Sequence, residues 1–302
     1  LFPEASDDAI ELIRQSEFAI SHSRLQGGNR ASLFESELME TFNRSMKIEG
    51  ELANALINKE MYLVYQPQLN VVTNRITGFE VLLRWNNKKL GVVSPADFIP
   101  VAEEKGFIVK IGKWLIQETL QTARKWLDLG FEFGTLSVNI SPVELVQKNF
   151  RKTLLESCLL YDVPPERIKI EITERTVMAS NAENVTIINK LIADGFKIAL
   201  DDFGVGYSNF NFLFEFEITT LKLDKSLIGN IADEKRRFFI ESLIKLRQFK
   251  EFDVIAEGVE TKEELDLLME LGCQRIQGYL FSRPLKQVAA ENFLVDFIKA
   301  SE

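Results

Sequence analysis

The chain has 302 residues, of which 46% are hydrophobic and 27% charged, a composition typical of a soluble globular protein with a full core. It has no apolar run of the roughly 20 residues that a membrane-spanning helix needs, and it does not start with a secretory signal pattern. A net charge of −9 argues against broad binding of nucleic-acid polymers, although metal ions held by carboxylates would still attract a small anion.

The first part of the chain is predicted to be helical and separate from the rest. Helices are expected at Asp7–Ser23 and Leu33–Leu56, and Gly27-Gly28-Asn29 favours a turn between them. We therefore expect a helical tail with a linker helix in residues 1–50 and one main domain in residues 51–302.

From Tyr62 onward, short β-rich runs alternate with longer amphipathic segments, which is typical of stacked βα units. The expected strands are Tyr62–Leu69, Ile76–Trp85, Thr135–Ile140, Ile168–Thr173, Lys197–Asp202, Thr220–Leu223, Asp253–Glu257 and Arg275–Tyr279. Helices are expected between them at Ile108–Leu129, Ala182–Asp194, Glu234–Phe249 and Lys262–Leu271. The pattern predicts an α/β fold, a TIM-like (β/α)8 barrel.

The first two strands differ from the others because only Asn70–Arg75 separates them. A connection this short cannot carry a parallel crossover, so the pair is predicted to form an antiparallel hairpin. The barrel should therefore be a modified one with an antiparallel first strand.

Histidine and cysteine are scarce, and this limits the chemistry. The single histidine, His22, lies in the N-terminal region, so a Ser-His-Asp triad and a histidine zinc site in the barrel are excluded. Cys158 and Cys273 are isolated, which fits small core residues in a reducing compartment, and we expect a cytoplasmic location. The possibility of a membrane anchor in a preceding part of a longer parent protein stays open.

Acidic and amide residues fall at, or just inside, the predicted carboxyl ends of the strands, where barrel enzymes have their active sites. They are Glu80, Asn139, Glu171, Asp201, Asp202 and Glu257. Each alone could be a helix cap or a surface ion pair, but six on consecutive strands predict a common site. Oxygen ligands without histidine or thiolate suit hard cations, so Mg²⁺ or Mn²⁺ is preferred to zinc.

The adjacent pair Asp201-Asp202 needs a special backbone arrangement, since successive side chains of a strand point to opposite faces. Both can approach one site if the strand ends there and the chain turns, and Gly204 and Gly206 are expected to supply the turn. One aspartate could then bridge two ions roughly 3.5–4 Å apart, as in in-line displacement at phosphorus.

Lys222 lies in the apolar run Leu221–Leu223, an unusual setting for lysine. Alone it would be a solvated or ion-paired lysine. With the carboxylates on the same face, we expect it to reach the barrel mouth, hold an attacking water and stabilise phosphate charge. The triplet Asp202-Phe203-Gly204 matches the kinase D-F-G sequence, but no Gly-rich loop or H-R-D accompanies it, so a kinase is excluded.

Eight motifs, in order along the chain, resemble those of the EAL-domain family of cyclic di-GMP phosphodiesterases, from about Glu51 to Leu285. They are Y-Q-P from Tyr65, E-V-L-L-R-W from Glu80, S-V-N-I-S from Ser137, E-I-T-E from Glu171, D-D-F-G from Asp201, L-K-L-D from Leu221, A-E-G-V-E from Ala256 and Q-G-Y from Gln277. The resemblance implies hydrolysis of cyclic di-GMP to linear pGpG with two Mg²⁺ or Mn²⁺ ions on a modified TIM barrel. Ca²⁺ is expected to occupy the site without turnover.

The resemblance also implies roles for single residues. One metal ion would be held by Glu80, Asn139, Glu171 and Asp201, and the second by Asp201, Asp202 and Glu257. Lys222 matches the lysine that contacts the hydrolytic water, and Gln277 matches the glutamine of the site. Gln66 and Arg84, together with Tyr279, match positions that hold the dinucleotide. Glu174 resembles a glutamate that braces the loop after Asp202, a loop tied in this family to metal binding and to homodimer contacts.

The chain departs from the family pattern at Val81, where alanine is usual, at Val205, and in the aromatic stretch Phe210–Ile218. In the N-terminal region, Asp7–Ile13 and Gln26–Arg30 resemble the tail of a GGDEF domain without the cyclase signature. We therefore expect no cyclase activity in this chain, and an upstream GGDEF-like or sensor domain in its parent protein.

Two alternatives to an active phosphodiesterase stay open. A receptor would bind cyclic di-GMP without cleaving it and pass the signal through Leu33–Leu56. A metal-dependent barrel enzyme acting on another phosphodiester would account for the carboxylates, but it would leave the motifs of Gln66, Arg84 and Gln277 unexplained.

Overall fold

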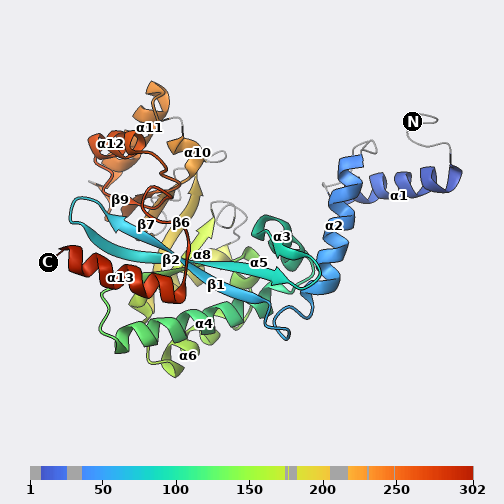
Figure 1. Cartoon of the computed structure of the whole chain (residues 1–302), viewed down its shortest axis with the longest axis horizontal. Helices are drawn as coiled ribbons and strands as arrows, with labels where there is room; N and C mark the ends of the chain where they lie inside the picture. Colours follow the sequence, from blue (N-terminus) through green and yellow to red (C-terminus); the bar gives the residue numbers. More distant parts are fainter. Residues whose placement is uncertain are drawn as a thin grey trace.

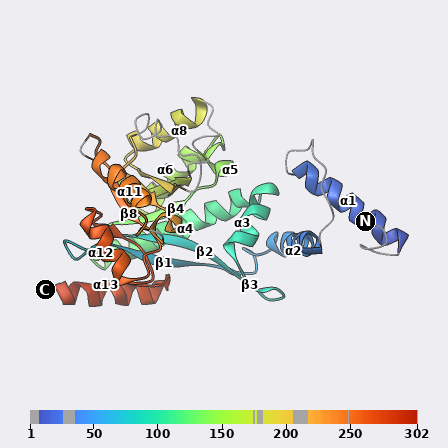
Figure 2. The ribbon, with the colours of Figure 1, turned by 90° about the horizontal axis from the view of Figure 1, so that it is seen from above.

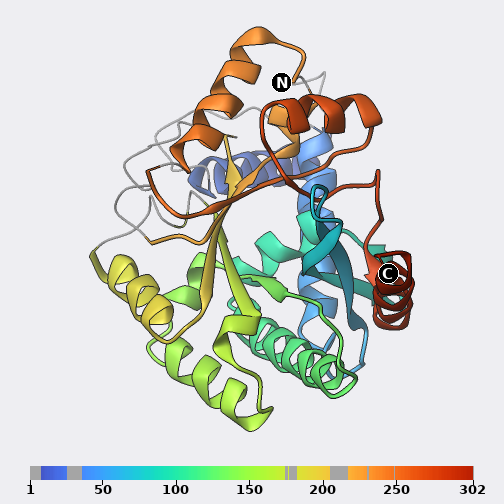
Figure 3. The same cartoon turned by 90° about the vertical axis from the view of Figure 1, so that its left-hand side faces the viewer.

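The computed structural model describes residues 8–25, 36–173, 176, 182–204, 217–229, 231–247 and 249–301. Its main body is a closed barrel of eight strands surrounded by helices (Figures 1 and 3). The barrel strands are β1 Met61–Asn70, β2 Arg75–Asn87, β4 Thr135–Asn139, β5 Ile168–Thr173, β6 Lys197–Phe203, β7 Thr220–Leu223, β8 Asp253–Ala256 and β9 Arg275–Ile276. The expected α/β barrel is confirmed.

The antiparallel first strand is also confirmed. β1 pairs antiparallel with β2, from Met61 opposite Trp85 to Asn70 opposite Arg75. From β2 through β4, β5, β6, β7 and β8 to β9 the neighbours are parallel, and β9 then pairs antiparallel with β1 to close the ring. Two short strands that the sequence did not predict, β3 Gly91–Val93 and β10 Leu285–Lys286, extend the sheet beside β2 and β1.

The last barrel strand is shorter than predicted. Sequence pattern predicted a strand at Arg275–Tyr279, but β9 ends at Ile276 and turns follow from Gly278. A side chain at Gly278 would lie 2.0 Å from the Val259 carbonyl oxygen, so the chain approaches its neighbour too closely for anything but glycine.

The helices of the barrel domain pack outside the strands (Figure 3). They are α3 Pro95–Glu104, α4 Ile108–Asp128, α5 Pro142–Leu145, α6 Phe150–Leu160, α8 Ala182–Ala193, α10 Lys225–Ile228, α11 Glu234–Leu246, α12 Lys262–Glu270 and α13 Gln287–Ser301. The four predicted helices are present as α4, α8, α11 and α12, whereas α3, α5, α6, α10 and α13 were not predicted. In α3, Pro100 interrupts the helical pattern.

Two helices precede the barrel, α1 Ala9–Leu25 and α2 Ser36–Leu52. Figures 1 and 2 show both on one side of the barrel, with α1 farther from it than α2. The second helix ends four residues before the predicted Leu56, because the chain turns from residue 53. It packs against α3, and its residues Ile48 and Leu52 belong to the main core. No helix in the described ranges is long and apolar enough to cross a membrane.

Alternation along the strands separates an apolar layer from a polar barrel interior. Tyr65 and Phe79 point outward and pack with Trp126 of α4, at ring-centroid distances of 5.4 and 5.2 Å. Their inward neighbours include Gln66 and Glu80, which are directly opposite each other on β1 and β2. The polar side chains therefore gather inside a ring that an apolar shell holds rigid.

Candidate functional site

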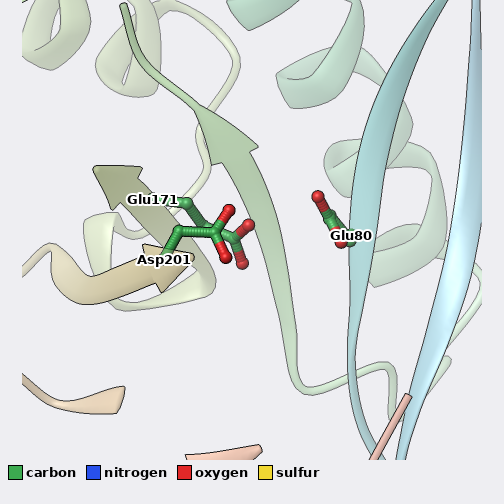
Figure 4. Close-up of side chains that lie close together, drawn as sticks. All are labelled: Glu80, Glu171 and Asp201. Atoms are coloured by element: carbon green, nitrogen blue, oxygen red, sulfur yellow. The ribbon is translucent and has the colours of Figure 1, made fainter. Parts of the chain in front are cut away.

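Three buried carboxylates converge from three different barrel strands. Glu80 lies on β2, Glu171 on β5 and Asp201 on β6. Each offers one oxygen atom, and the three oxygens lie within 4.8 Å of one another. Figure 4 shows Glu171 and Asp201 side by side, with Glu80 facing them from the other wall. The parallel register brings residues from positions 80, 171 and 201 together as the sequence predicted.

Lys222 of β7 lies among these carboxylates, with its side chain 1% exposed. Its Nζ is 2.5 Å from Glu171 Oε2, 2.7 Å from Glu257 Oε1, 3.1 Å from Asp201 Oδ1 and 3.5 Å from Glu80 Oε2. The lysine reaches the site from the apolar β7, as expected. One ammonium thus faces four carboxyl groups in a buried place.

Burial and charge shift the acidities of these groups in different directions. Burial raises the pKa of Glu171 to about 8, with Lys222 partly offsetting it, and raises the pKa of Glu257 well above its usual range. Burial also acts to raise the pKa of Glu80, but attraction to Lys222 and hydrogen bonds from amides outweigh it and lower that pKa. Burial acts to lower the pKa of Lys222, whereas the surrounding carboxylates hold it well above its usual value.

Side-chain amides fix the orientation of Glu80. Asn139 Nδ2 donates to Glu80 Oε1 at 2.9 Å, and Gln277 Nε2 donates to Glu80 Oε2 at 2.5 Å. Gln277 also donates to Gln66 Oε1 at 3.3 Å and accepts from Gln68 Nε2 at 2.8 Å. Sequence reasoning missed Gln68, although its spacing from Gln66 places both on one face of β1.

The pair Asp201-Asp202 adopts a different backbone arrangement from the predicted one. The strand does not end at Asp202; β6 continues to Phe203, with a register irregularity between Leu200 and Phe203. Asp202 has φ +55°, a left-handed conformation that aspartate tolerates, and its N–H donates to Asp201 Oδ1 at 2.9 Å. A bulge inside the strand, and not only the glycine turn after it, reorients the second aspartate. Gly206 lies outside the described residues.

The other predicted site residues lie around this centre. Asp202 is exposed and outside the close group of three carboxylates. Gln66 is buried and donates to Ser282 O at 3.3 Å, whereas Arg84 is half-buried and donates to Leu83 O at 2.8 Å. Tyr279 is 48% exposed, with the Arg283 guanidinium 4.4 Å from the centre of its ring. Glu174, Val205 and most of Phe210–Ile218 lie outside the described residues.

The donor set fits divalent cations. Its groups are carboxylates and one amide, the ligands that hard cations prefer. Glu171 Oε1 is buried and has no hydrogen-bond partner among the residues that the structure describes. Since burial raises the pKa of Glu171 to about 8, a cation bound at this carboxylate would compete with a proton for it.

Comparison with known proteins identifies the family. The sequence model of the EAL domain family matches residues 49–284 of this chain. The chain belongs to the EAL domain family. It is similar to MucR of Pseudomonas aeruginosa, a bifunctional diguanylate cyclase/cyclic di-GMP phosphodiesterase. The two are 31% identical over 286 residues, which make up 94% of this chain and 42% of MucR. The cyclic di-GMP phosphodiesterase PdeR of Escherichia coli is 29% identical over 300 residues, 99% of this chain and 45% of PdeR. This EAL chain thus spans less than half the length of these relatives.

Solved structures of other EAL proteins agree with this fold. The MucR phosphodiesterase in complex with cyclic di-GMP matches with a TM-score of 0.77 at 31% identity, over 82% of this chain and 99% of that one. The EAL enzyme Bd1971, in a form bound to cAMP and cyclic di-GMP, matches with a TM-score of 0.78 at 32% identity, over 97% of this chain and 77% of that one.

Proposed function

We propose that this EAL domain is a metal-dependent phosphodiesterase that hydrolyses cyclic di-GMP to linear pGpG. The buried group of Glu80, Glu171 and Asp201 around Lys222 carries the proposal, because it combines a hard-cation site with a fixed ammonium. Relatives that are named cyclic di-GMP phosphodiesterases, and a related structure in complex with cyclic di-GMP, support the choice of substrate.

In the proposed site, Glu80, Asn139, Glu171 and Asp201 hold one divalent ion, and Asp201, Asp202 and Glu257 hold a second. Mg²⁺ or Mn²⁺ held there would neutralise phosphate charge and lower the pKa of a water molecule in the site, so that it loses a proton more easily. Water oxygen forms the new bond to phosphorus, the bond to a ribose 3′ oxygen breaks, and that oxygen takes up a proton. The product is linear pGpG with a 5′-phosphate.

The chain's own side chains orient the reactants. Lys222, held in place by its carboxylate partners, positions the attacking water and stabilises negative charge on the phosphoryl oxygens. Gln277 keeps Glu80 in one orientation through its hydrogen bond. At the mouth of the barrel, Gln66, Arg84 and the half-exposed ring of Tyr279 bind the dinucleotide, and Glu174 braces the loop after Asp202.

An assay with purified protein tests this function. Incubation with cyclic di-GMP and Mg²⁺ or Mn²⁺ should give pGpG, detected by chromatography, and Ca²⁺ in place of these ions should give none. Glu171→Gln should lower kcat at least about 100-fold, because it removes a charged ligand of the site. Glu156→Gln, at an exposed ion pair on α6, is the matched control and should retain activity. Metal-loaded protein that binds cyclic di-GMP without turnover would contradict the proposal and favour a receptor.

We also propose the wider organisation of the protein. Residues 1–50 form the helical tail of a GGDEF-like domain and a linker helix, residues 51–302 form the phosphodiesterase barrel, and the chain acts in the cytoplasm as a homodimer. The length of relatives such as MucR, whose name includes a diguanylate cyclase, supports an upstream GGDEF-like or sensor domain. Light scattering of the purified chain tests the dimer, since a monomer mass at micromolar concentration would contradict it.

A further inference from the structure

Gln68 is a fully buried side chain of β1, 0% exposed, to which the motifs of the site give no role. Its Nε2 donates to Gln277 Oε1 at 2.8 Å. Strand register explains this contact. Leu69 is opposite Ile276 in the antiparallel pair of β1 and β9, so the next position places Gln68 opposite Gln277.

Gly78 leaves the space that Gln68 occupies. It is opposite Gln68 on β2, and a Cβ atom at Gly78 would lie 3.1 Å from Gln68 Oε1 and 2.7 Å from the Thr135 carbonyl oxygen. A side chain at position 78 would therefore press on Gln68 from the side away from β9. The missing side chain leaves room for the Gln68 amide, which donates to Gln277.

The bond from Gln68 favours the direction in which the Gln277 amide faces. A carboxylate only accepts hydrogen bonds, so Glu80 Oε2 requires the Nε2 end of Gln277. Rotation of the amide by half a turn would put Gln277 Oε1 against the Glu80 carboxylate. The same rotation would put Gln277 Nε2 against Gln68 Nε2, so it would require the Gln68 amide to turn as well.

The other end of the Gln68 amide argues against a purely structural role. Its Oε1 is buried and has no hydrogen-bond partner in the part of the chain that the structure describes. An apolar side chain of similar length would fill the position without leaving a buried acceptor unpaired. We propose that Gln68 is a positioning residue, which holds Gln277 and, through it, the Glu80 carboxylate in the orientation that binds the metal ion. This inference rests on the proposed function of the site.

Titration of the free protein with Mn²⁺, followed by electron paramagnetic resonance, tests the inference without turnover. Gln68→Met keeps the length and removes the donor, and it should raise the Mn²⁺ dissociation constant about 10- to 100-fold, as for other partners of metal ligands. Thr122→Val is the matched control. It removes another buried hydrogen bond to β1, between Tyr65 OH and Thr122 Oγ1 at 2.8 Å, on the outward side of the strand. It should bind Mn²⁺ like the unchanged chain.

A second variant, Gln68→Glu, gives a signature that loss of stability cannot produce. An ionised carboxylate at position 68 would attract Gln277 Nε2 and turn the amide away from Glu80, whereas a protonated carboxyl can again donate to Gln277 Oε1. The Mn²⁺ affinity of Gln68→Glu, divided by that of the unchanged chain at the same pH, should therefore rise several-fold as the pH falls from 8 to 6. When kcat and KM of the Gln68 variants are measured with cyclic di-GMP, the loss of activity should appear in kcat.

The outcomes separate this inference from the proposed function. If Gln68→Met binds Mn²⁺ within twofold of Thr122→Val, or if the affinity ratio for Gln68→Glu does not change with pH, the positioning role is wrong, whether or not the chain cleaves cyclic di-GMP. If the unchanged chain does not cleave cyclic di-GMP, the proposed function fails, and the Mn²⁺ titrations still decide the role of Gln68.

Discussion

At the scale of single residues, Lys222 balances the charge of the site. Replacing it with methionine would leave four buried carboxyl groups without their ammonium partner. The raised pKa values of Glu171 and Glu257 would then rise further, because the attraction of Lys222 no longer opposes burial and the repulsion between the carboxylates. A raised pKa in the folded state means that the folded chain keeps protons that the unfolded chain releases. The stability of Lys222→Met should therefore fall as pH rises from about 5 to 8.

Urea denaturation of Lys222→Met without metal measures this effect. At pH 8 the free energy of unfolding should be about 3–5 kcal/mol below that of the unchanged chain, and the difference should shrink at pH 5. Lys225→Met, three residues along the chain, is the matched control, because Lys225 forms an exposed ion pair with Glu260 and should contribute under about 1 kcal/mol. Equal losses in the two variants would contradict the charge-balancing role.

The sequence predicted Glu80, Glu171, Asp201 and Lys222 as one site because strand alternation and barrel geometry suffice to bring them together. It did not predict Gln68 or the bulge at Asp202, for two physical reasons. The contact of Gln68 with Gln277 depends on the register between the first and last strands, which pair only when the barrel closes. The φ angle of +55° at Asp202 does not follow from the residue types, because the same residues also suit a simple turn after the strand.

At the scale of elements, the turn after β4 contains a buried acid that makes stability depend on pH. Glu144 caps the short helix α5, where its Oε2 accepts from the Ser141 N–H at 3.1 Å. It also lies against α4, since a Cβ atom on Gly112 would be 1.5 Å from Glu144 Oε1. Burial raises the pKa of Glu144 from 4.5 to about 7, with the nearby Glu103 adding to the rise.

This shift predicts a pH dependence of folding that one variant removes. Between about pH 4.5 and 7 the unfolded chain releases the Glu144 proton while the folded chain keeps it, so Glu144 makes stability fall as pH rises. Across this range, the free energy of unfolding of Glu144→Gln should increase by up to about 3 kcal/mol relative to that of the unchanged chain. Glu264→Gln, in the same capping arrangement at the surface on α12, is the control for loss of the cap. If the free energies of unfolding of Glu144→Gln and the unchanged chain, measured with urea, differed by the same amount at every pH from 5 to 8, the pKa of Glu144 would not be raised.

Elements differed in how well the sequence predicted them. The eight barrel strands were recognised because each is a short β-rich run, whereas the short β3 and β10 were not. The hairpin followed from the short connection at Asn70–Arg75. The helices α3 and α6 carry weaker signals, with a proline inside the first and a mixed polar and apolar surface on the second. Their place is set by packing on the barrel, which a local pattern does not contain.

At the scale of the whole molecule, the site lies where strands far apart in sequence meet. Its carboxylates come from β2, β5 and β6 and from the end of β8, so a cation bound among them would link segments from Glu80 to Glu257. Unfolding must separate these ligands, and metal binding should therefore stabilise the entire barrel and not only the loops at its mouth. By mass action, Mn²⁺ at about 100 times its dissociation constant should add about 2.7 kcal/mol to the free energy of unfolding.

Urea denaturation of the unchanged chain with Mn²⁺, and with EDTA in its place, measures this stabilisation. Ca²⁺ should stabilise the barrel too, although it is not expected to support turnover, because stabilisation needs only binding. In Glu171→Gln the same Mn²⁺ concentration should add much less, since one ligand charge is lost, whereas Glu156→Gln should respond like the unchanged chain. If Mn²⁺ stabilised Glu171→Gln as much as the unchanged chain, the ion would bind elsewhere, and the carboxylates around Lys222 would not form the metal site.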